Sequence, residues 1–197
     1  MIRRMGLKNM TLAAFFAILT GIGAQIHIPI SVLPITLQTS LVLITGILLG
    51  AKTGAVSMAL YLFLGLLGLP LFVGGGGLHS IFAPSFGFII GFIPAAWASG
   101  YISRKIPYPT PLRIISACMA GILFIYAFGL AGLYLNLNYF AGKPFTVYQT
   151  LALGFFPFII PELLKIAATT ALCTAIEKRL RFLNHPEEKS LYTDRSA

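Results

Sequence analysis

Two ionisable side chains interrupt a long apolar stretch near the C-terminus, in the segment PELLK at residues 161–165. Glu162 and Lys165 are three residues apart, so on a helix they occupy neighbouring positions of one face. If the stretch crosses a membrane, each charge costs about 2.5–3.5 kcal/mol to insert, and such residues usually face the protein interior or a cavity. The pair therefore indicates a functional site. An ion pair within the helix, with Lys165 reaching to the outer surface, is the open alternative.

The proline before this pair indicates what the two groups can bind. Pro161 suits the first turn of a helix, whose positive end would then lie beside Glu162 and keep its carboxylate ionised. Lys165 would remain a free cation for a ligand carboxylate. Glu162 could accept hydrogen bonds from ligand N–H groups.

A glycine-rich loop at residues 73–87, VGGGGLHSIFAPSFG, is the second candidate site. Its four consecutive glycines allow unusual dihedral angles and a close approach of the backbone to a ligand. A glycine-rich run of this kind more often forms a flexible external loop, here with a surface histidine, than a ligand-binding site. The candidate ligand-binding residues of this loop are Gly75, His79, Phe82, Ser85, Phe86 and Gly87.

The segment LPITLQTS at residues 33–40 is the third candidate. Thr36, Gln38 and Thr39 open a predicted helix, so part of their polarity serves helix capping. Gln38 lies one turn inside the span, where its amide needs a hydrogen-bond partner. We therefore count Thr36 and Gln38 among the candidate substrate-binding residues.

Two other patterns do not support a function. The segment GILLGAKT at residues 46–53 differs by one residue from the phosphate-binding loop pattern GxxxxGK[ST]. It ends a predicted membrane helix instead of following a strand, so Lys52 is better explained as a topology charge. The sequence also contains no HExxH, no GxSxG and no metal-ligand spacing, which argues against catalysis and against a metal site.

The composition places all of these candidates in a membrane. Of the 197 residues, 57% are hydrophobic and only 10% are charged, against about 25% charged residues in a soluble domain. A span takes roughly 20 apolar residues, so the length allows six spans and almost nothing else. The predicted fold class is an all-α integral membrane bundle of six transmembrane helices. One transmembrane domain is expected at residues 1–183, followed by a polar cytoplasmic tail at 184–197.

The spans and their orientation follow from the apolar runs and from the basic residues between them. The predicted helices cover residues 9–26, 36–51, 55–70, 86–103, 112–136 and 150–180. With the N-terminus inside, twelve lysines and arginines fall in the cytoplasm, Lys143 falls outside and Lys165 lies within the membrane. This asymmetry predicts that both termini are cytoplasmic. It also accounts for the net charge of +9 without a nucleic acid as partner.

Small residues recur at four-residue spacing in two of the predicted helices, which lets helix backbones approach closely. In the first helix Ala13, Ala17 and Gly21 form such a stripe. Contact with a partner protein and packing within the chain explain that stripe about equally well. A second stripe, from Gly87 to Ser99 in the fourth helix, is assigned to packing within the chain.

Four longer segments, taken in order, resemble the BioY family, the biotin-binding S components of energy-coupling-factor transporters. They read GAQIHIPISVLPITLQTS, LLGAKTGAVSMALYLFLGLLGLPLF, GGGGLHSIFAPSFGFIIGF and PFIIPELLK. The resemblance runs from about Ala13 to Arg179. The order and spacing of the segments are together more specific than any single piece.

The resemblance implies a six-helix bundle in the cytoplasmic membrane of a prokaryote, with an external pocket for biotin beneath the first and third loops. It implies neither a cofactor nor an enzymatic activity in this chain. A transmembrane coupling subunit would dock on the small-residue stripe of the first helix, where Ala13 and Ala17 match the family. Two separate ATPase subunits would use ATP to drive release of the vitamin inwards.

The ligand contacts of the family carry over to Glu162 and Lys165, with departures nearby. The family usually has Asp where Glu162 stands, so the carboxylate extends one methylene further. Phe86 stands where the family has glycine, and Phe88 lacks a phenol hydroxyl. These departures leave a second hypothesis open, an S component for another small vitamin or acid such as dethiobiotin. An intramembrane enzyme is the third hypothesis.

Overall fold

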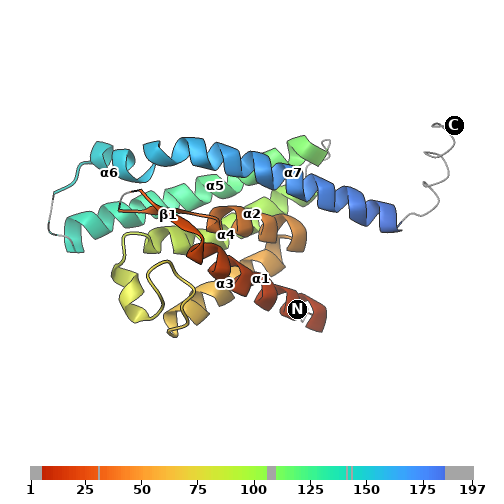
Figure 1. Cartoon of the computed structure of the whole chain (residues 1–197), viewed down its shortest axis with the longest axis horizontal. Coiled ribbons are helices and arrows are strands. Elements are labelled where there is room, and N and C mark those ends of the chain that lie inside the picture. The colour runs from red at the N-terminus through yellow and green to blue at the C-terminus, as the bar shows by residue number, and fades with distance from the viewer. Residues whose placement is uncertain (1–5, 31, 106–109, 141, 143, 185–197) are drawn as a thin grey trace.

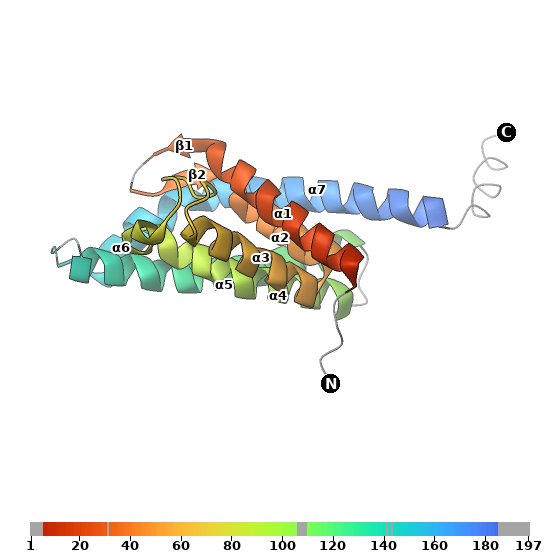
Figure 2. The ribbon, with the colours of Figure 1, turned by 90° about the horizontal axis from the view of Figure 1, so that it is seen from below.

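The computed structural model describes residues 6–30, 32–105, 110–140, 142 and 144–184. The predicted tail beyond residue 184 and Lys143 lie outside the described residues. Within them, the chain is a bundle of helices with a small two-stranded sheet at one end (Figures 1 and 2).

The elements run from α1 at the N-terminus to α7 at the C-terminus. The helices are α1 (Leu7–Gln25), α2 (Gln38–Leu49), α3 (Ala51–Leu66), α4 (Phe86–Lys105), α5 (Thr110–Leu135), α6 (Val147–Gly154) and α7 (Ile159–Asn184). The strands β1 (His27–Pro29) and β2 (Pro34–Thr36) form an antiparallel hairpin between α1 and α2. Short helical turns occur at η1 (Leu78–Phe82), η2 (Asn136–Phe140) and η3 (Phe156–Phe158).

The lengths of the helices confirm an all-α membrane protein. The stretches that are long and apolar enough to cross a membrane are Leu7–Gln25, Phe86–Lys105, Pro111–Phe140 and Val147–Arg179. The apolar helices α2 and α3 have 12 and 16 residues, which corresponds to about 18 and 24 Å of helix. The hydrocarbon core measures about 30 Å, so the helices at the predicted spans 36–51 and 55–70 are shorter than the core.

A single residue, Gly50, makes the turn between α2 and α3. Its φ of +81° is a conformation that glycine adopts readily. The gap between the predicted helices 36–51 and 55–70 puts a loop at the segment AKTG (residues 51–54), and this expectation is wrong. They form the first turn of α3, where the Gly54 N–H donates to the Gly50 carbonyl at 2.8 Å. One glycine with a positive φ thus replaces a four-residue loop, and α3 begins four residues earlier than predicted.

The last predicted span, residues 150–180, is divided into two helices. α6 ends at Gly154, the backbone turns at Phe155 (φ −127°, ψ −59°), and η3 carries Pro157 in its first turn. Proline has no N–H donor and its ring clashes with the preceding turn of a helix, so a continuous helix is interrupted there. A new helix, α7, therefore starts after the break, and Glu162 lies in its first turn.

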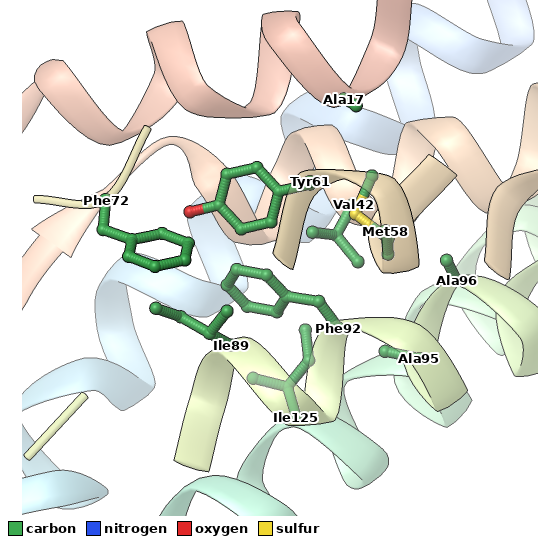
Figure 3. Packing of buried hydrophobic residues seen from close by; sticks show 10 residues of the cluster. All are labelled: Ala17, Val42, Met58, Tyr61, Phe72, Ile89, Phe92, Ala95, Ala96 and Ile125. Atoms are coloured by element: carbon green, nitrogen blue, oxygen red, sulfur yellow. The ribbon is translucent and has the colours of Figure 1, made fainter. Parts of the chain in front are cut away.

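Aromatic side chains fill the core between α1, α3 and α4 (Figure 3). The ring of Tyr61 lies 5.4 Å from that of Phe72 and 6.1 Å from that of Phe92, measured between centroids. Met58 and Ala17 pack in the same cluster and are fully buried. The tilted and edge-on ring arrangements are the favourable ones for aromatic pairs.

The small-residue stripe of α1 faces this core. Ala13 and Ala17 are 1% and 0% exposed, and the Ser57 hydroxyl donates to the Ala13 carbonyl at 2.7 Å. A Cβ added to Gly21 would lie 2.4 Å from a methyl carbon of Leu71. The structure therefore uses the stripe for packing of α1 against α3 and the loop after it. This burial favours packing within the chain, the alternative that the sequence left open. Docking of a coupling subunit on Ala13, Ala17 and Gly21 stays a prediction.

Replacing Ala17 with tryptophan is expected to destabilise the isolated chain by about 3 kcal/mol, because a large ring has no space in a closely packed core. The measurement is thermal unfolding of the purified chain in detergent. The neighbouring Ile18 is 52% exposed, and Ile18→Trp, the matched control, is expected to unfold like the parent. An Ala17→Trp chain of normal stability that no longer assembles with a coupling subunit would support docking instead of packing.

The stripe in the fourth helix packs within the chain, as predicted. A Cβ at Gly87 would lie 2.7 Å from the Phe128 carbonyl oxygen and 2.8 Å from the Gly132 Cα. One at Gly91 would lie 3.1 Å from the Ile125 Cα. The backbones of α4 and α5 are therefore in direct contact. This contact fixes the position of the first residues of α4, among them Phe88 and Ile89, which line a pocket.

Candidate functional site

A pocket lies between the starts of α2, α4 and α7 and the middle of α5, bordered by the hairpin and the loop after α3. About 70 Å³ of it can be occupied by the centres of water molecules, several times the roughly 10–15 Å³ that one water requires. Its apolar walls are Leu33, Pro34, Val73, Phe88, Ile89, Phe92, Ile125, Tyr126, Gly154 and Phe158. Its polar residues are Thr36, Gln38, Thr39, Ser85, Glu162 and Lys165. The pocket is thus largely apolar with one polar side, as small-molecule sites usually are.

Three side chains form a closed polar cluster on that side. The Lys165 Nζ donates to Glu162 Oε1 at 2.7 Å and to Thr39 Oγ1 at 2.9 Å. The Thr39 hydroxyl in turn donates to Glu162 Oε1 at 3.2 Å. Glu162 and Lys165 are only 6% and 9% exposed. The break before α7 and the start of α2 are what bring these residues together.

Both expectations about Lys165 need correction. It is not a free cation, because Glu162 neutralises it, and it does not reach to the outer surface, because it is buried. The physical reason is the low dielectric of the interior, where an unpaired charge is far more costly than a paired one. Lys165 uses two of the three donors of an ammonium group for these contacts.

Glu162 is left with one unused acceptor. Its Oε2 is buried and has no hydrogen-bond partner among the described residues. A buried acceptor without a donor costs about 1–3 kcal/mol or more when charged, so a donor from a ligand fits this position. The cluster therefore offers an acceptor at Glu162 and a remaining N–H at Lys165, side by side.

Gln38, predicted to need a partner, has one deep in the core. Its Nε2 donates to the Tyr61 hydroxyl at 2.6 Å, and that hydroxyl donates to the Leu71 carbonyl at 3.2 Å. The Gln38 N–H, at the first residue of α2, donates to the Thr36 hydroxyl at 3.3 Å, although the N-cap position itself is Leu37. The two pocket residues Thr36 and Gln38 are therefore held in place by the core.

Some of the predicted loop residues lie elsewhere. The predicted ligand contacts that do not line the pocket are Gly75, His79, Phe82, Phe86 and Gly87. Gly75 closes a tight turn with Phe72, and its φ is +101°. The conformational freedom of this glycine is therefore used to fold the loop and not to contact a ligand. His79 is exposed, Phe82 is 58% exposed with its ring against Phe140, and Gly87 contacts α5. Of this loop, Ser85 and Val73 border the pocket.

Several pocket residues were not found by sequence reasoning. Thr39 was read as a capping residue, yet it bonds both members of the ion pair. Tyr126 lies inside the apolar run of α5, and its ring packs edge-on against Phe88 at 5.9 Å and Phe155 at 5.3 Å. A hydroxyl in the middle of a span was the only signal for Tyr126. No spacing in the sequence joins α5 to the pocket.

Comparisons with known proteins agree with this architecture. The model of the BioY family matches residues 1–182. The probable biotin transporter BioY of Lysinibacillus sphaericus is 34% identical over 181 residues, which cover 92% of each chain. The probable biotin transporter BioY of Pyrococcus horikoshii is 35% identical over 171 residues, which cover 86% of this chain and 96% of that protein.

A solved structure extends the similarity to three dimensions. A crystal structure of the S-component for biotin from an ECF-type ABC transporter matches with a TM-score of 0.75 and 26% identity. The match covers 89% of this chain and 95% of that chain. The family model spans nearly the whole sequence, and two relatives are more than 30% identical over most of both chains. The chain therefore belongs to the BioY family.

Proposed function

We propose that this chain captures biotin and serves as the substrate-binding S component of an ECF-type transporter. The observation that carries the proposal is the cluster of Glu162, Lys165 and Thr39 on one side of an apolar pocket. The names of the relatives, biotin transporters and an S-component for biotin, support the same ligand. The chain is a transport protein in this proposal, not an enzyme, and it needs no cofactor of its own.

The chemistry of biotin fits the cluster at its ureido end. A ureido group carries N–H donors beside a carbonyl acceptor. An N–H group can donate to Glu162 Oε2, and the carbonyl can accept from the remaining N–H of Lys165. A carboxylate at the same place would lie beside the Glu162 carboxylate, where like charges repel. The valerate carboxylate, which a free Lys165 would have attracted, is therefore assigned to the open side of the pocket.

The proposal also covers the topology and the partners. Six spans, with α2 and α3 as the two short ones, place both termini in the cytoplasm of a prokaryote and the pocket near the outer face of its cytoplasmic membrane. The excess of basic residues on one side supports this orientation. A transmembrane coupling subunit and two ATPase subunits would energise release of biotin. Because Ala13 and Ala17 are buried in this arrangement, we place the contact surface of these subunits outside the stripe of α1.

Calorimetric titration of the detergent-purified chain tests the ligand assignment. Biotin is expected to bind with nanomolar affinity, and biotin amide, which keeps the ureido ring but has no carboxylate, within about tenfold of it. Lipoate, which has the carboxylate but no ureido group, is expected to bind at least about a hundredfold more weakly, because the buried Glu162 acceptor then stays unpaired.

Other outcomes would change the conclusion. Tighter binding of dethiobiotin than of biotin would favour the second function, capture of a related acid. Strong binding of lipoate with none of biotin amide would place the carboxylate at Lys165. A folded preparation that binds no biotin would overturn the proposal.

A further inference from the structure

A second cavity lies at the end of the bundle opposite the pocket. The pocket meets α4 at Phe88 near its start, whereas this cleft meets α4 at Tyr101, Arg104 and Lys105 near its end. The helix has 20 residues, so the two ends are about 30 Å apart. The starts of α1 and α3 border the same cleft. In Figure 2 these two helix starts and the end of α4 lie together on the side of the N-terminus.

The described groups around the cleft are basic or neutral. Lys52, Arg104 and Lys105 line it, and no acidic residue does so within the described part of the chain. Neither α1 nor α3 has an acidic residue in its first turn or a side-chain hydrogen bond at its N-cap. The positive ends of both helices are therefore not neutralised by these groups. The negative end of α2 meets the same cleft at Leu49, and the Arg104 side chain lies beside it at Gly50. The cleft favours an anion.

Thr53 adds a hydrogen-bond donor to the basic residues of the cleft. This residue lines the cleft and is only 8% exposed. No described residue bonds to its hydroxyl, and this oxygen is not one of the fully buried atoms without a partner, so it is open to the cleft. The charges at the end of α4 are also suited to neutralise the negative end of that helix. That role does not account for Lys52, nor for the hydroxyl of Thr53, to which no described residue bonds.

The residues Gly50, Lys52 and Thr53 belong to the segment that resembled a phosphate-binding loop. In the structure, Gly50 has a positive φ and directly precedes a helix, with Lys52 and Thr53 in the first turn. Backbone N–H groups at a helix start, a lysine and a threonine hydroxyl are the groups that bind phosphate in proteins. No strand precedes the glycine, so the resemblance covers the phosphate chemistry alone.

The aromatic residues beside the cleft indicate where the phosphate comes from. Trp97 stacks on Tyr101 at 5.1 Å, and the Lys105 ammonium lies 4.8 Å from the centre of the Tyr101 ring. Trp97 and Tyr101 are 45% and 41% exposed, as expected of aromatic residues at the depth of lipid headgroups. We propose that this cleft binds the phosphate headgroup of an anionic phospholipid in the adjacent leaflet.

The single tryptophan of the chain, Trp97, makes the proposal testable without a label. The full chain in a neutral detergent is titrated with dioctanoyl phosphatidylglycerol, and the fluorescence of Trp97 is recorded. Because Lys105 contacts the Tyr101 ring on which Trp97 stacks, an anion that draws Lys105 away alters the emission. A saturable change with phosphatidylglycerol and none with dioctanoyl phosphatidylcholine is the expected result. Equal changes with both lipids would overturn the proposal.

Substitutions locate the site. Lys52→Gln and Arg104→Gln are each expected to weaken phosphatidylglycerol binding about fivefold, the contribution of one basic residue near anionic lipid. Thr53→Val, which removes only the hydroxyl, is expected to weaken it a few-fold. Lys178→Gln removes a basic residue near the end of α7, outside the cleft, and is expected to change nothing. Thermal unfolding confirms that each variant is folded.

The remaining outcomes are equally decisive. If Lys178→Gln weakens binding as much as Arg104→Gln does, binding follows net charge and the cleft is not the site. If inorganic phosphate or ATP at submillimolar concentration suppresses the phosphatidylglycerol signal, the cleft binds a soluble phosphate compound and the lipid assignment is wrong. Suppression by neither, together with the expected losses in the variants, supports the lipid.

Discussion

Replacing Lys165 with methionine is expected to weaken biotin binding at least about a hundredfold. The substitution removes the donor proposed for the ureido carbonyl, and it leaves the Glu162 carboxylate buried at 6% exposure without its cation. Breaking one half of a buried pair costs about 3–5 kcal/mol, so thermal stability is expected to fall as well. Calorimetry with biotin and thermal unfolding in detergent measure the two effects. Lys178→Met, on the same helix and away from the pocket, is the matched control.

A double variant separates the two effects of this change. Glu162→Gln combined with Lys165→Met removes both charges and leaves no unpaired ion. Replacing a buried pair with neutral groups is often nearly neutral for stability. The double variant is therefore expected to regain most of the lost stability but not the binding of biotin. Normal biotin binding in either variant would show that the pair is structural and that the site is assigned to the wrong residues.

Gly87→Val is expected to destabilise the chain by about 3 kcal/mol, because the added carbons meet backbone atoms that cannot move aside. The first of them would lie 2.7 Å from the Phe128 carbonyl oxygen and 2.8 Å from the Gly132 Cα. Thermal unfolding measures the loss. Gly74→Val is the matched control, because a Cβ at Gly74 has no atom within 4 Å.

The same variant tests the role predicted for Gly87 from the sequence. If packing against α5 is its role, Gly87→Val loses stability first and biotin binding only as a consequence. A chain with unchanged stability and no affinity for biotin would instead support a direct ligand contact at Gly87.

Much of the architecture could be predicted because it depends on local properties of the chain. The apolar composition excludes a soluble fold whatever the arrangement of the helices. The second and third helices follow from the apolar runs at residues 36–51 and 55–70. The pairing of Glu162 with Lys165 was also predictable, because residues three apart on one helix are neighbours in any tertiary structure.

Other features depend on single backbone conformations that residue types alone do not specify. AKTG is compatible with a loop, and it becomes a helical turn because Gly50 takes a φ of +81°. Likewise, the apolar run from 150 to 180 is compatible with one long helix, and the turn at Phe155 and Pro157 divides it. The turn at Phe155 and Pro157 determines where α7 begins, and it therefore places Glu162 in the first turn of that helix.

The sequence by itself determined the membrane class and the helical fold, and it placed residues 162 and 165 on one helix face, with their ion pair as one of two alternatives. Only the tertiary structure decided that Thr39, 123 residues before Glu162, completes the cluster, and that Ala17 faces the core of the chain. In soluble proteins an apolar stripe shows which helix face is buried. Helices of a membrane protein are apolar on all sides, because lipid and protein interior are similarly apolar. Their sequences therefore indicate that they span the membrane, and side-chain packing decides which faces meet.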